Sequence, residues 1–118
     1  MPLSRTILLV EPDVACGRVL AEVLRRGGDR VRVVRTSAQA VQAAARQSYD
    51  LAVVHLLIRG GGVELARKLS RRVPRLYLSV GARLLGDEIL ETALGFPVVR
   101  KARVHAHLAR PRGPRSNG

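Results

Sequence analysis

The sequence is poor in aromatic residues and cysteine and has no long apolar run, and each shortage excludes a class of structure. Its aromatic residues are two tyrosines and one phenylalanine, so side chains on which nucleic-acid bases could stack are scarce. The only cysteine, Cys16, excludes an internal disulfide and, among apolar neighbours, predicts a buried, unreactive thiol in a reducing compartment. The early apolar run at residues 7–10 is too short for a signal-peptide core or a membrane span. We therefore expect a cytoplasmic protein that does not enter a membrane.

Acidic residues are also few. The chain has nine of them and 21 basic residues, which gives a formal net charge of +12. Such an excess ordinarily indicates an anionic partner. No acid follows Glu91, and residues 110–118 combine arginine with proline and glycine, which predicts a basic, disordered C-terminal tail. The tail predicts weak, nonspecific attraction to nucleic acid. The arginines between residues 63 and 73 are interpreted as a solvated helix face.

The remaining pattern predicts one α/β domain over residues 1–109. Short apolar runs, typical of buried strands, alternate with helix-forming segments. Strands are expected at 6–10, 31–34, 50–57, 76–80 and 97–99, and helices at 14–26, 37–47, 63–73, 87–94 and, shortened, 103–109. This order predicts a doubly wound, five-stranded parallel sheet in a three-layer α/β/α architecture.

Local signals refine three of these helices. The first is amphipathic, with an apolar face formed by Cys16, Val19, Leu20, Val23 and Leu24. Ser37 is the predicted N-cap of the second helix, and Pro74 is expected to end the third. The glycines at 60–62 predict a flexible connection before the third helix.

Polar residues end several of the apolar strands. Glu11 and Asp13 follow the first strand, His55 ends the third, Ser79 ends the fourth and Lys101 follows the fifth. Because the carboxyl ends of parallel strands meet at one edge, where α/β proteins place their functional sites, we expect these side chains to converge.

In order and spacing, four segments resemble the receiver domain of bacterial two-component response regulators, roughly over residues 5–109. They are residues 7–11, 49–55, 74–79 and 98–101. The resemblance implies a flavodoxin-like fold with strand order 2-1-3-4-5. It also implies a phosphoryl-accepting aspartate at the end of strand three, Mg²⁺ held by that aspartate and by an acidic pair after strand one, and a protein-docking face on the fourth helix, fifth strand and last helix.

This chain departs from the family at several of those positions. His55 stands where the resemblance places the acceptor aspartate, Pro12 where it places the second acid, and Val98 where it places an aromatic switch residue. Ser79 and Lys101 match the positions that bind phosphoryl oxygens. We interpret Glu11, Pro12, Asp13, His55, Ser79 and Lys101 as a degenerate phosphorylation site of an atypical pseudo-receiver, with no metal, since Mg²⁺ prefers an octahedral shell of oxygens.

The primary hypothesis is a non-enzymatic signalling module that binds a protein partner independently of phosphorylation, without a cofactor. Two alternatives stay open. One is a basic, nucleic-acid-associated regulator on a receiver fold, and the other is a phosphorelay receiver that uses a non-standard acceptor. His55 itself is interpreted as structural, filling space and forming a hydrogen bond or an ion pair beside Glu11 and Asp13.

Overall fold

The computed structural model describes residues 4–80, 95–100 and 108. Its elements, in chain order, are β1 (Thr6–Val10), α1 (Val14–Arg26), β2 (Arg30–Val34), α2 (Ser37–Arg46), β3 (Leu51–His55), α3 (Gly62–Leu69), β4 (Arg75–Val80) and β5 (Val98–Arg100). The strands form one five-stranded sheet in the order β2-β1-β3-β4-β5, and all four strand pairs are parallel. The predicted doubly wound fold and strand order are confirmed.

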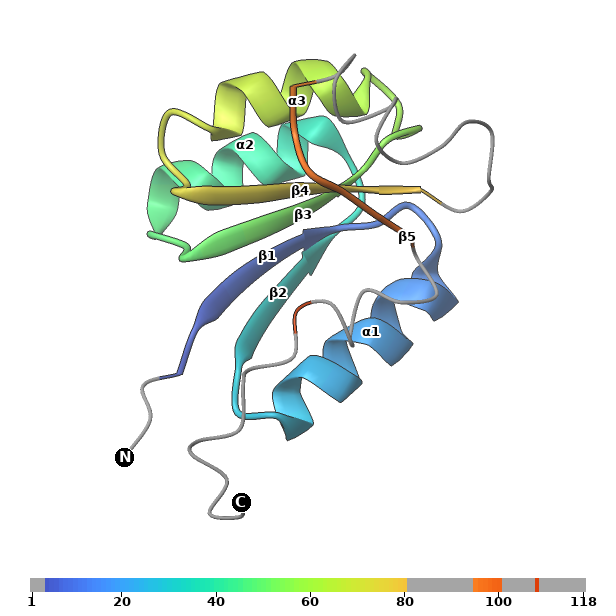
Figure 1. Ribbon diagram of the computed structural model, residues 1–118, viewed down its shortest axis with the longest axis vertical. Helices are drawn as coiled ribbons and strands as arrows, with labels where there is room; N and C mark the ends of the chain where they lie inside the picture. Colours follow the sequence, from blue (N-terminus) through green and yellow to red (C-terminus); the bar gives the residue numbers. More distant parts are fainter. Residues whose placement is uncertain (1–3, 81–94, 101–107, 109–118) are drawn as a thin grey trace.

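The described helices cover both faces of the sheet. In Figure 1, α1 lies on one face, and α2 and α3 lie side by side on the other. The predicted helix at 87–94, Lys101 and the predicted tail at 110–118 lie outside the described residues. So does the predicted helix at 103–109, except for Leu108, which is helical and buried.

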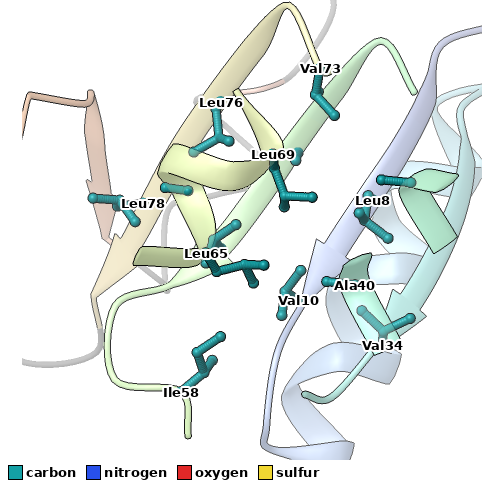
Figure 2. Packing of buried hydrophobic residues seen from close by; sticks show 14 of the residues in the cluster. Leu8, Val10, Val34, Ala40, Ile58, Leu65, Leu69, Val73, Leu76 and Leu78 are labelled. Carbon is teal, nitrogen blue, oxygen red and sulfur yellow. The ribbon is translucent and has the colours of Figure 1, made fainter. Parts of the chain in front are cut away.

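Alternation along the strands divides the core into two clusters, because successive side chains of a strand point to opposite faces. Leu8 and Val10 of β1 belong, with Ala40 of α2 and with Leu65 and Leu69 of α3, to the cluster on the α2/α3 side (Figure 2). Ile7 and Leu9 belong to the cluster on the α1 side. The central strand, β3, is buried at every position, as expected for a strand covered on both faces.

The buried face of α1 differs from the predicted one. Gly17, Leu20, Ala21 and Leu24 are buried, whereas Val19 is 63% exposed and Val23 is 39% exposed. A Cβ atom on Gly17 would lie 3.1 Å from Cγ1 of Val33 in β2, so the absence of a side chain there lets α1 approach the sheet closely. The helix thus packs through Gly17 and Ala21 together with two leucines, Leu20 and Leu24. Cys16 is partly exposed, so the prediction of a buried thiol was wrong.

Two predicted helix ends also shift. The N-cap of α2 is Thr36, whose Oγ1 accepts a hydrogen bond from the Gln39 amide at 3.1 Å, and Ser37 is the first helical residue. Helix α3 ends at Leu69, four residues before the predicted Val73. The helical conformation is disfavoured for a residue that precedes a proline. Val73, which precedes Pro74, accordingly lies outside the helix, after a turn, and is buried.

A polar contact that the sequence did not predict joins three distant segments. Arg5, which precedes β1, donates to both carboxylate oxygens of Asp29, at 3.0 Å and 2.8 Å. Its guanidinium also donates to the carbonyl oxygen of Leu108 at 2.7 Å. Arg5 therefore links Leu108 to the turn that connects α1 and β2.

Candidate functional site

Three of the predicted strand-end residues lie at the carboxyl edge of neighbouring strands. His55 of β3 is in register with Ser79 of β4, and Glu11 follows Val10, which is in register with Val54. All three are buried, with exposed fractions of 1% for Glu11, 9% for His55 and 2% for Ser79. Strand alternation directs them toward the α1 side of the sheet. The structure thus places a carboxylate, an imidazole and a hydroxyl on adjacent strands at one level.

The imidazole of His55 is used by the backbone of its own loop. Its Nδ1 accepts a hydrogen bond from the Leu57 amide at 3.1 Å. A ring nitrogen that accepts a hydrogen bond carries no proton, so the proton of the neutral ring lies on Nε2. Because the Nδ1 lone pair is engaged, Nδ1 cannot accept a phosphoryl group or bind a metal while the loop keeps this conformation.

The two acids after β1 also bond backbone amides. Oε2 of Glu11 accepts from the Asp13 amide at 3.0 Å, and Oδ1 of Asp13 accepts from the Cys16 amide at 2.9 Å. Asp13 is therefore the N-cap of α1, a position where a carboxylate satisfies an amide and interacts favourably with the helix dipole. Pro12 lies between them and is partly exposed. The acids of this turn hold the start of α1 in place.

Sequence reasoning missed the role of Gly62. Its amide donates to the Leu56 carbonyl at 3.1 Å, and a Cβ atom at this position would lie 2.5 Å from the carbonyl oxygens of both His55 and Leu56. Only glycine fits so close to two backbone carbonyls. The sequence signal was the run of three glycines, which we interpreted as a flexible connection. In the structure, Gly62 allows the start of α3 to lie in close contact with the backbone at the end of β3.

The other predicted positions are less informative about chemistry. Val98 is buried and in register with Leu78, on the α2/α3 side of the sheet.

Within residues 4–80, 95–100 and 108, no three histidine, cysteine or carboxylate side chains gather as metal ligands. None of the described helices is long and apolar enough to cross a membrane.

The fold is that of CheY-like receiver domains. No protein-family model matches the chain, and no curated protein matches it. Among solved structures, the chain is similar to a sensor protein from Polaromonas sp. JS666 at 24% identity and a TM-score of 0.70, covering 91% of this chain and 90% of that one.

Two receiver domains are similar over comparable lengths. The N-terminal receiver domain of Klebsiella pneumoniae RstA, described as BeF3-activated, is 24% identical, with a TM-score of 0.72 over 89% of this chain and 99% of that one. The receiver domain of the Francisella response regulator 1452 is 14% identical, with a TM-score of 0.76 over 90% and 91% of the two chains. Similarity at these identities establishes the architecture.

Proposed function

We propose that this chain is a pseudo-receiver, a non-enzymatic signalling module that binds a protein partner without being phosphorylated. The observation that supports this proposal most strongly is the state of His55. It ends the central strand β3, at the position that the receiver resemblance gives to the acceptor aspartate, and its Nδ1 is engaged by the Leu57 amide.

The donor set at the edge does not fit the Mg²⁺ ion of family receivers. Mg²⁺ requires near-octahedral oxygen ligands, but an imidazole stands at the centre of the edge, and Pro12 supplies no side-chain ligand. One oxygen of Glu11 and one of Asp13 already accept backbone amides. Moving the Asp13 carboxylate onto a cation would release the Cys16 amide at the start of α1, and the loss of such a helix cap costs about 1 kcal/mol.

The receiver fold supports a role in signal transduction, and we place the partner's docking site on the face formed by the fourth helix, β5 and the last helix. That face is the one the receiver resemblance implies. A cytoplasmic location belongs to the same proposal. Since most of the docking face lies outside the described residues, the experiment that follows uses the whole chain.

The test is phosphorylation of the intact protein. The chain is incubated with Mg²⁺ and a small-molecule phosphodonor and its intact mass is measured. Amide NMR spectra are then recorded during titration with Mg²⁺ and beryllofluoride, a phosphoryl mimic. We expect no mass increase and no saturable shift at the amides of Glu11, His55 and Ser79. Addition of one phosphoryl group, or localised saturable shifts, would refute phosphorylation independence.

A positive control comes from rebuilding the edge. The double variant Pro12→Asp/His55→Asp restores the acidic residues that the receiver resemblance expects, and we expect it to gain Mg²⁺-dependent shifts. A captured protein partner should bind the untreated chain and the phosphodonor-treated chain with the same affinity. Binding that requires the phosphodonor would contradict the proposal.

A further inference from the structure

Five exposed cations lie around the outer side of α3 and the ends of α2 and α3. Helix α3 turns Leu65, Ala66 and Leu69 toward the sheet, which leaves its basic residues on the solvent side. We call this set the α3 basic surface; it consists of Arg46, Arg67, Lys68, Arg71 and Arg72, all of which are exposed. Figure 1 shows α2 and α3 adjacent on this face of the sheet.

The α3 basic surface is hollowed in two places. One cavity, of about 440 Å³, lies between the end of α2 and the turn after α3; Arg46 and Arg72 line it together with polar residues of the α2–β3 connection, Gln47 and Ser48 among them. A second, also of about 440 Å³, is lined by Glu64, Arg67, Lys68 and Arg71. Cations from the end of α2, from α3 and from the turn after α3 thus border two hollows large enough for phosphate groups.

Among the described residues, acidic side chains do not neutralise this surface. Glu64 is the one carboxylate of this part of the chain that lines either cavity. The ion pairs in the described part of the chain, Arg5 with Asp29 and Arg26 with Glu22, involve none of the five cations. Like charges held close together repel one another, and a polyanion would relieve that repulsion.

The chemistry of the surface favours a nucleic acid over a protein as its partner. Specific protein interfaces have an apolar centre, but the large exposed apolar residues of the described chain lie neither on α3 nor in the two cavities. They are Val14, Val19, Val23, Val41 and Leu57. Contacts to a phosphate backbone need no apolar centre, and the arginine fork binds phosphate oxygens in pairs.

We propose that the α3 basic surface binds the phosphate backbone of double-stranded nucleic acid without sequence preference. The connections that follow α2 and α3 lead into the amino ends of β3 and β4. Arg46, Arg71 and Arg72 therefore lie at the opposite edge of the sheet from Glu11, His55 and Ser79. Binding at this surface does not depend on the proposed role of the strand-end site, and either proposal can fail without the other.

The test measures the salt dependence of DNA binding by two charge-matched variants. Fluorescence anisotropy of short labelled duplexes of two unrelated sequences is followed over a series of salt concentrations, using the full chain. One variant removes four cations of the surface, Arg67→Ala/Lys68→Ala/Arg71→Ala/Arg72→Ala. The control removes four exposed cations elsewhere, Arg18→Ala/Arg30→Ala/Arg32→Ala/Arg35→Ala, which lowers the net charge equally.

We expect the wild type to bind both duplexes with equal affinity. Each phosphate contact contributes about 0.9 to the slope of log K against log salt, so losing four contacts lowers its magnitude by up to about 3.6. The surface variant should therefore bind at least about tenfold more weakly in low salt, while the control should retain most of its affinity. Far-UV circular dichroism checks that both variants are folded, and the single reversal Arg71→Glu, which should also weaken binding, provides a milder perturbation.

Several results would overturn the proposal. Equal losses in the surface variant and the control would show that binding follows net charge and not this surface. Loss of binding only in Arg110→Ala/Arg112→Ala/Arg115→Ala would assign it to residues 110–118 instead. Tighter binding to polyglutamate than to DNA would identify the partner as an acidic polypeptide, and the absence of DNA binding by the wild type would end the proposal outright.

Discussion

Removing the Arg5 guanidinium should destabilise the whole domain, because it leaves a buried carboxylate without its cation. The Asp29 side chain is 2% exposed, and the Arg5 side chain is 19% exposed. Two charge-assisted hydrogen bonds join them, and a third reaches the Leu108 carbonyl. Breaking a buried ion pair by removing one partner typically costs about 3 to 5 kcal/mol.

The partial exposure of Arg5 reduces this figure, because water can reach the vacated space and solvate Asp29. We expect Arg5→Ala to lower the free energy of unfolding by about 2 to 4 kcal/mol. That is a large share of the roughly 5 to 15 kcal/mol that stabilises a typical domain. In the double variant Arg5→Ala/Asp29→Ala the two losses should not add, with a coupling free energy of about 1 to 3 kcal/mol.

Urea unfolding followed by far-UV circular dichroism measures these free energies. The matched control is Arg26→Ala, which breaks the i,i+4 ion pair with Glu22, whose side chains are 78% and 58% exposed. It should cost less than about 0.5 kcal/mol. If Arg5→Ala cost no more than this control, or if the Arg5 and Asp29 losses were additive, the argument that burial makes this pair strong would be refuted.

Three further predictions use the same unfolding measurement. Gly62→Ala must displace backbone carbonyls and should cost about 3 kcal/mol, the upper end for overpacking. Gly27 has a φ of −80°, and a Cβ atom there would have its nearest contact at 3.4 Å, so Gly27→Ala should be nearly neutral. Similar losses in the two variants would contradict the steric explanation. Asp13→Ala should cost about 1 kcal/mol through loss of the α1 cap and Asp13→Asn much less, so equal effects would rule out capping. His55→Asn keeps an acceptor for the Leu57 amide and should be the more stable variant by about 1 kcal/mol compared with His55→Leu; the reverse order would show that this hydrogen bond contributes little.

Local sequence patterns were sufficient to predict the bounds of an element where neighbouring residues determine the conformation. The first strand and first helix have the predicted bounds, Thr6–Val10 and Val14–Arg26. An apolar run ended by an acid-proline-acid turn, and a helix closed by two glycines, are signals that act within a few residues. The parallel sheet followed from the alternation of such segments, and its strand order followed from the receiver resemblance.

The errors arose where packing chose between equivalent local options. Val19 and Val23 fit the apolar face of α1 as well as Leu20 does, but Gly17 lets the helix approach β2 on the side where Gly17 lies, which leaves the two valines exposed. Thr36 and Ser37 are both good N-caps, and only the first lies where its oxygen meets the Gln39 amide. Spacing alone cannot distinguish such neighbours.

The sequence by itself determined that Glu11, His55 and Ser79 end strands of one parallel sheet, because strand ends are marked by local changes from apolar to polar residues. Only the tertiary structure decided how these groups are used. It assigned Nδ1 of His55 to the Leu57 amide and brought Arg5 to Asp29 and Leu108, 24 and 103 residues away. Hydrogen bonds require atoms to meet within about 3 Å, and that proximity is created by the packing of whole elements.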